Sequence, residues 1–141
     1  MSITENGQGG SAGAAAGLPD LPGFDMAGAL QRLGGNQKLY RTLLERFYNG
    51  YNNKFSQDIQ AGLAAGNLEE TQRNAHTVKG LAGTIGHAGL AEASLGLEMA
   101  CKNALQGSGS SSELEPALAR FLAQLEAVIN ALSTIFGPAQ A

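Results

Sequence analysis

The apolar residues of this chain recur at the spacing of an α-helix, and this periodicity restricts the possible folds more than any other feature. It is clearest after residue 113, where apolar side chains fall three and four positions apart: Leu114, Leu118, Phe121, Leu122, Leu125, Val128, Ile129, Leu132 and Ile135. Side chains at this spacing lie along one stripe of a helix. No segment shows the competing alternation of a strand, so the sequence predicts an all-α protein.

Glycines and capping residues mark where the predicted helices begin and end. Asp25 is expected to cap a short helix that stops at Gly34-Gly35, and Asn36 to cap the next helix. That second helix keeps its period over residues 37–63, with a bend or break expected near Gly50. Two further long helices are predicted before the last one: residues 68–85, capped by Gly66-Asn67 and ended by Gly86, and a segment with Leu90, Ser94, Leu97, Cys101 and Ala104 on one stripe.

Four long helices with mostly short connections predict an antiparallel up-down four-helix bundle, with the short additional N-terminal helix folded over one end. The length suits a single domain, which we place at residues 23–137. Residues 1–22 are rich in Gly, Ala and Ser and are expected to form a flexible tail or linker.

Charge and cysteine content exclude several classes of function. The formal net charge of -3 and the absence of clustered Lys and Arg argue against a nucleic-acid-binding protein. Cys101 is the only cysteine, so the chain forms no internal disulfide or thiolate metal site, and a reducing compartment such as the cytoplasm is expected. No signal peptide and no apolar run long enough to cross a bilayer are evident. We therefore expect a cytoplasmic monomer without direct membrane contact, either on its own or as part of a larger membrane-anchored protein.

The segment from His76 to Gly86 places a histidine and two glycines on one face of a predicted helix. At about 100° per residue, Lys79, Gly80 and Gly83 project within roughly 60° of His76, whereas the apolar residues of the segment project to the far side. Each glycine costs a helix roughly 1 kcal/mol relative to alanine. We interpret the glycines as providing access, so that a large partner can approach the imidazole.

The residue types on this face suit phosphoryl transfer. A neutral imidazole, with an ordinary pKa of about 6.5, is a nucleophile that needs no strong base at neutral pH. Phosphoryl transfer mainly requires positioning and positive charge near the non-bridging oxygens, which Lys79 supplies from one turn away. Gly80 and Gly83 would let the rim of a donor's active site come close to the helix.

The run His76-Thr77-Val78-Lys79-Gly80, continued by Gly83 and Ile85-Gly86, resembles the signature of histidine-containing phosphotransfer (HPt) domains of bacterial two-component phosphorelays. The likeness covers roughly residues 24–135, through the segments 33–47 and 90–98. Val78 departs from it, since such domains often have leucine there.

This resemblance implies a role for each residue of the exposed face. His76 would be the phospho-accepting residue, Lys79 the cation that stabilises the phosphate, and Gly80, with Gly83, the steric gap. The implied partners are receiver domains of response regulators and of a hybrid sensor histidine kinase, of which this chain would be a separate carrier or the C-terminal domain. The implied Mg²⁺ is held by the receiver, so the chain would bind no cofactor of its own and would have no ATP-dependent kinase activity.

The same residues also bear on three other functions. A metal or haem bundle is disfavoured because Arg73 and Thr84 stand three residues before the two histidines, where a Glu-x-x-His pair needs Glu. The phosphoacceptor region of a histidine kinase normally has an acidic residue after its histidine, where this chain has Thr77. A helical module that docks receivers without passing phosphate stays open.

Single residues also have ordinary structural interpretations. Lys79 and Arg73 are each consistent with a solvated charge, although Arg73 lies one turn before His76, within reach of a phosphate or a partner. Gly80 and Gly83 are consistent with close helix packing, which their angle disfavours. His87 is not matched to a phosphorylated position and is interpreted as structural or idle.

Overall fold

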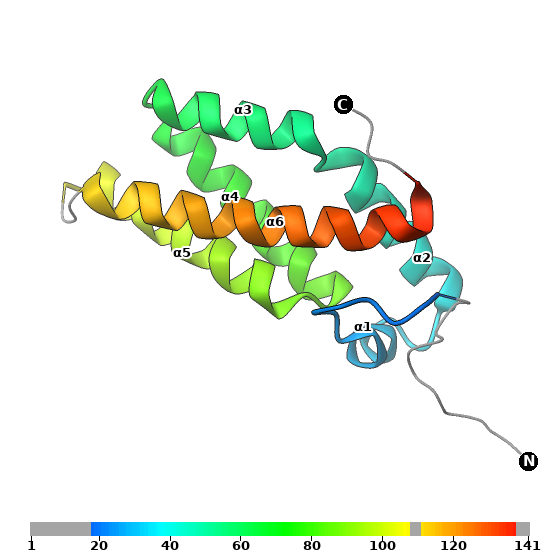
Figure 1. Cartoon of the computed structure of the whole chain (residues 1–141). Coiled ribbons are helices and arrows are strands. Elements are labelled where there is room, and N and C mark those ends of the chain that lie inside the picture. Colours follow the sequence, from blue (N-terminus) through cyan, green and yellow to red (C-terminus); the bar gives the residue numbers. More distant parts are fainter. Residues whose placement is uncertain (1–17, 108–110, 138–141) are drawn as a thin grey trace, which may run out of the picture.

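Helices are the only regular elements in the part of the chain that the structure describes, which is residues 18–107 and 111–137 of this computed structural model. The all-α prediction is therefore confirmed. Figure 1 shows α1 (Met26–Arg32), α2 (Gln37–Gly50), α3 (Asn53–Ala64), α4 (Leu68–Ile85), α5 (Ala88–Leu105) and α6 (Leu114–Phe136), with a short 3-10 turn over Ser111–Glu113.

Side-chain caps begin the helices where the sequence places them. The Asp25 side chain accepts a hydrogen bond from the Gly28 amide at the start of α1. The Asn36 side chain accepts one from the Leu39 amide at the start of α2. The break expected near Gly50 is present, because α2 ends there and Asn52 caps a separate helix, α3. Asn67 begins α4 as expected, although its side chain makes no capping hydrogen bond.

The four long segments form the predicted bundle, with α2 and α3 together making one of them (Figure 1). α4 and α5 run antiparallel and pack along their lengths, α6 packs on α5, and α1 lies across the end where α4 stops and α5 begins. The centre is filled by side chains from every long segment: Tyr40, Leu44, Val78, Leu90, Leu97, Phe121, Leu125, Val128 and Leu132. Burial of these apolar surfaces is the main stabilising contribution to the fold.

Two expectations require correction. The sequence places Leu18 and Leu21 in the predicted tail, but both are buried in the core, so the domain begins before residue 23. Residues 1–17 of the predicted tail lie outside the described residues. α6, moreover, is long and apolar enough to cross a membrane by length and composition. In this structure it is a core helix, because its apolar stripe packs against the rest of the bundle.

The C-terminal end of α4 is fixed by the N-terminal elements. Carbonyl groups in the last turn of a helix lack partners within the helix. Arg32 Nη2 donates to the Gly83 carbonyl over 2.8 Å, and the Tyr40 hydroxyl donates to the Ile85 carbonyl over 2.8 Å. Gly86 ends the helix with φ of +92°, and a Cβ there would lie 2.6 Å from the Asp25 carbonyl oxygen. The helix that carries His76 is thereby held in position against α1 and α2.

Candidate functional site

His76 and Lys79 lie on one face of α4, and both contact the same carboxylate of α5. His76 Nδ1 lies 2.8 Å from Glu98 Oε2, and Lys79 Nζ donates to Glu98 Oε1 over 2.8 Å. The three side chains differ in exposure: 66% for His76, 32% for Lys79 and 15% for Glu98. The exposed imidazole of His76 therefore contacts a half-buried ion pair between Lys79 and Glu98.

The contact with Glu98 determines which ring nitrogen of His76 is free to react. Burial of Glu98 opposes its ionisation, but the hydrogen bonds from Lys79 and His76 outweigh this and lower the pKa of Glu98. An ionised carboxylate only accepts hydrogen bonds, so Nδ1 of a neutral His76 carries the proton. The lone pair then lies on Nε2, the nitrogen directed away from Glu98.

The two glycines of the same face border open space. A Cβ placed on Gly80 or Gly83 would have no neighbouring atom within 4 Å, and both residues are exposed. Close packing against another helix is thus excluded as the reason for either glycine. At these two positions, consequently, the α4 surface carries no side chain that would obstruct an approaching protein.

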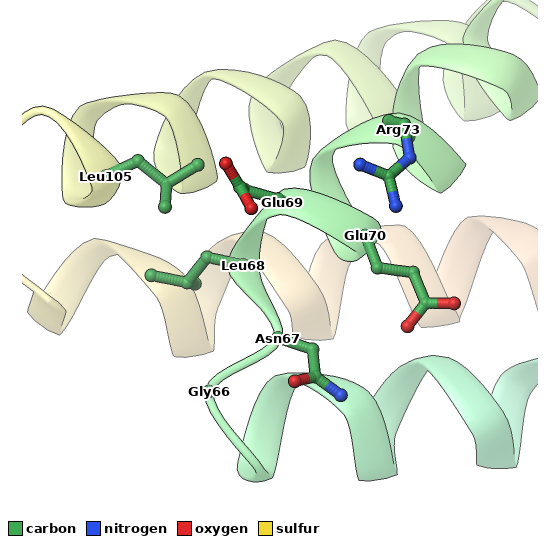
Figure 2. Close-up of a pocket in the computed structure, with 7 residues that line it drawn as sticks. All are labelled: Gly66, Asn67, Leu68, Glu69, Glu70, Arg73 and Leu105. Carbon is green, nitrogen blue, oxygen red and sulfur yellow. The ribbon is translucent and has the colours of Figure 1, made fainter.

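Arg73 lies beside His76 at a shallow depression in the surface. A hollow of about 430 Å³ is lined by Gln72, Arg73, His76, Thr77 and Glu98. Arg73 also lines a second hollow of about 340 Å³ at the start of α4, where Figure 2 shows it with Glu69 and Glu70. Arg73 therefore lies between the first turn of α4 and His76, and its side chain borders both hollows.

His87 has a structural position rather than a place in this site. It is buried between the segment that precedes α1 and the start of α5, where Phe24 contacts its ring edge-on at 5.0 Å between centroids. Its Nδ1 accepts a hydrogen bond from the Leu90 amide over 2.9 Å and so caps α5. Burial lowers the pKa of His87, which favours the neutral ring that this cap requires.

Of the four residues that the sequence indicated, His76, Lys79 and Gly80 lie together. The structure adds Glu98 to them. Gly80 adjoins His76 and Lys79 on α4, and Gly83 lies a further turn along, where Arg32 binds its carbonyl. Glu98 is the addition, because the sequence does not show which residue of another helix faces His76. Within the described ranges, no three His, Cys, Asp or Glu residues group together as a metal site would require.

Comparisons with known proteins point to one family. A family model described as the Hpt domain matches residues 52–134, which is more than half of the chain. Neither the curated proteins nor the solved structures searched gave a match. The matched segment begins just before α3 and includes His76, Lys79, Glu98 and both glycines, whereas α1 and α2 precede it.

Proposed function

Because this chain belongs to the Hpt domain family, we propose that His76 accepts a phosphoryl group from an aspartyl phosphate and passes it to another aspartate. The family has a phosphotransfer role in two-component signalling and acts as a phosphocarrier rather than a kinase. The observation that carries the residue assignment is the Glu98 carboxylate, which contacts both His76 Nδ1 and Lys79 Nζ.

The proposed step balances without an added acid or base. The Nε2 lone pair attacks phosphorus, and the bond from phosphorus to the donor's carboxylate oxygen breaks with its electron pair remaining on that carboxylate. A carboxylate is a stable leaving group at neutral pH and takes up no proton. Nδ1 keeps its proton, so the phosphorylated ring becomes a cation, which the 2.8 Å contact with Glu98 stabilises. The reverse reaction delivers the group to the next aspartate.

Lys79 supplies positive charge for the phosphoryl oxygens in this proposal. Its Nζ lies one turn from His76 and shares the Glu98 carboxylate with the imidazole. A flexible lysine can exchange part of its contact with Glu98 for a phosphoryl oxygen. Because the phosphoryl-transfer transition state is loose, a correctly placed cation and a fixed nucleophile are the main contributions the protein makes.

The partners we propose are receiver domains of response regulators and of a hybrid histidine kinase. An aspartyl phosphate on such a domain must approach Nε2 closely, and the open surface over Gly80 and Gly83 leaves room for this approach. Mg²⁺ is assigned to the receiver. A cytoplasmic location, as a separate carrier or as the C-terminal domain of a sensor kinase, is part of the same proposal, since Hpt domains are generally soluble and cytoplasmic.

The test is transfer from receivers that carry a radioactive phosphoryl group. The wild-type domain should acquire a label that is stable to alkali and lost in acid, as expected for phosphohistidine, and His76→Gln should acquire none. His87→Asn is the matched control, because position 87 is the only other histidine and should leave labelling intact. Label that persists in His76→Gln contradicts the assignment. Binding of receivers without any label would leave a docking module as the function.

A further inference from the structure

The charges around His76 balance before transfer but not after it. A neutral His76, one carboxylate and one ammonium group have no net charge together. A phosphoryl group adds close to two negative charges, while the ring gains only one positive charge. The phosphorylated site therefore has a negative charge that Lys79 and Glu98 do not compensate.

Lys79 is not free to supply the missing charge alone. Its ammonium group already pairs with Glu98 at 2.8 Å, and the carboxylate must stay ionised to bind the Nδ1 proton. Arg32, at the other end of the exposed face, donates to the Gly83 carbonyl. Arg73 is the cation that lines the same 430 Å³ hollow as His76 and Glu98, among the residues that the structure describes.

Arg73 has the position and freedom that such a contact requires. It stands three residues before His76, a rise of about 4.5 Å on the same helical face. Among the described residues its guanidinium has no ion pair, although Glu69 and Glu70 line the neighbouring hollow with it (Figure 2). A guanidinium presents paired N–H donors that match phosphate oxygens.

We propose that Arg73 binds the phosphoryl group once it is on His76, as a second cation beside Lys79. This inference rests on the proposed function, because it requires His76 to be the phosphorylated residue. Arg73 would contact the non-bridging oxygens from the N-terminal side of His76 and Lys79 from the C-terminal side. Its loss would therefore weaken the phosphorylated state while leaving the unphosphorylated fold unchanged.

Phosphoramidate, a small phosphoryl donor, tests this without any receiver. We expect Arg73→Gln to shorten the half-life of the phosphohistidine about three- to tenfold relative to wild type, as loss of one exposed charge-assisted contact predicts. Arg73→Lys should recover part of the half-life. Arg120→Gln is the matched control, since Arg120 is an exposed arginine of α6 that lines a different hollow. Thermal unfolding of each variant checks that the fold is retained.

The outcomes separate the two proposals. A shorter half-life in Arg73→Gln, partial recovery in Arg73→Lys and no change in Arg120→Gln support the inference. Equal half-lives in wild type and Arg73→Gln, or equal losses in Arg73→Gln and Arg120→Gln, overturn it while His76 remains the acceptor. If neither phosphoramidate nor phosphorylated receivers label wild type in a His76-dependent manner, the proposed function fails, and the inference fails with it.

Discussion

At the scale of the residue, one carboxylate organises the candidate site. Glu98 fixes the proton on Nδ1 of His76 and holds the Lys79 ammonium group one turn away. The sequence indicated His76, Lys79 and the glycines because they lie within one helix, where spacing determines which residues share a face. Glu98 lies 22 residues from His76 on another helix, and only the packing of α4 on α5 brings them together.

Replacing Glu98 should slow transfer from a receiver. Glu98→Ala removes both contacts, and we expect a rate about tenfold lower, since a hydrogen bond to a charged group contributes about 1.5–3 kcal/mol and exposure of His76 reduces this. Glu98→Gln keeps an acceptor for Nδ1 and should be intermediate. Rapid-quench measurement of transfer gives the rates, with Glu92→Ala, an exposed residue of the same helix, as control. A wild-type rate in Glu98→Ala contradicts the orienting role.

Bulk at Gly80 should obstruct docking without disturbing the fold. Gly80→Leu projects into open space next to His76, so it should slow transfer at least about tenfold, which corresponds to a docking penalty near 1.4 kcal/mol. Gly96→Leu is the control, because Gly96 is also an exposed helical glycine beside open space, roughly 160° around α5 from Glu98. If both variants transfer at the wild-type rate with unchanged helical content, the glycines do not provide access.

At the scale of the element, side-chain caps determine where α1, α2 and α5 begin. The sequence predicted the caps at Asp25 and Asn36 because both are residue types that commonly cap helices. It did not predict the cap at His87, since a histidine accepts such a bond only as the neutral tautomer that burial favours here. Nor did composition reveal that Leu18 and Leu21 are buried in the core, because their burial depends on how the chain packs in three dimensions.

His87 should make the stability of the fold depend on pH. Its pKa is lowered in the native state, so below its ordinary value of about 6.5 the unfolded chain binds a proton more readily than the folded one. The unfolding free energy should therefore be fully retained above that pH and decrease on acidification, with a slope of at most about 1.4 kcal/mol per pH unit.

Urea unfolding between pH 8 and pH 5 measures this slope. His87→Asn, whose side chain can still cap α5, should flatten it, although the lost contact with Phe24 lowers stability at every pH. His76→Asn changes the only other histidine and should retain the slope. A slope that survives in His87→Asn would assign the pH dependence to other groups.

At the scale of the whole molecule, the bundle presents one exposed face of α4 and fixes the C-terminal end of this helix. Periodicity predicted the helices and their order, and short connections predicted the antiparallel arrangement that Figure 1 shows. The family match covers residues 52–134, yet the bonds that fix the end of α4 come from Asp25, Arg32 and Tyr40, which precede it. The N-terminal elements thus belong to the structural support of the site.

Nε2 of His76 is the atom proposed to carry the phosphoryl group, and nuclear magnetic resonance can identify this atom. In the ¹⁵N-labelled domain phosphorylated by a receiver, coupling between ³¹P and ¹⁵N identifies the nitrogen that carries the phosphoryl group. We predict coupling to Nε2 of His76 alone, with Nδ1 of the same ring retaining its proton toward Glu98. Coupling to Nδ1 of His76, or to either nitrogen of His87, would contradict it.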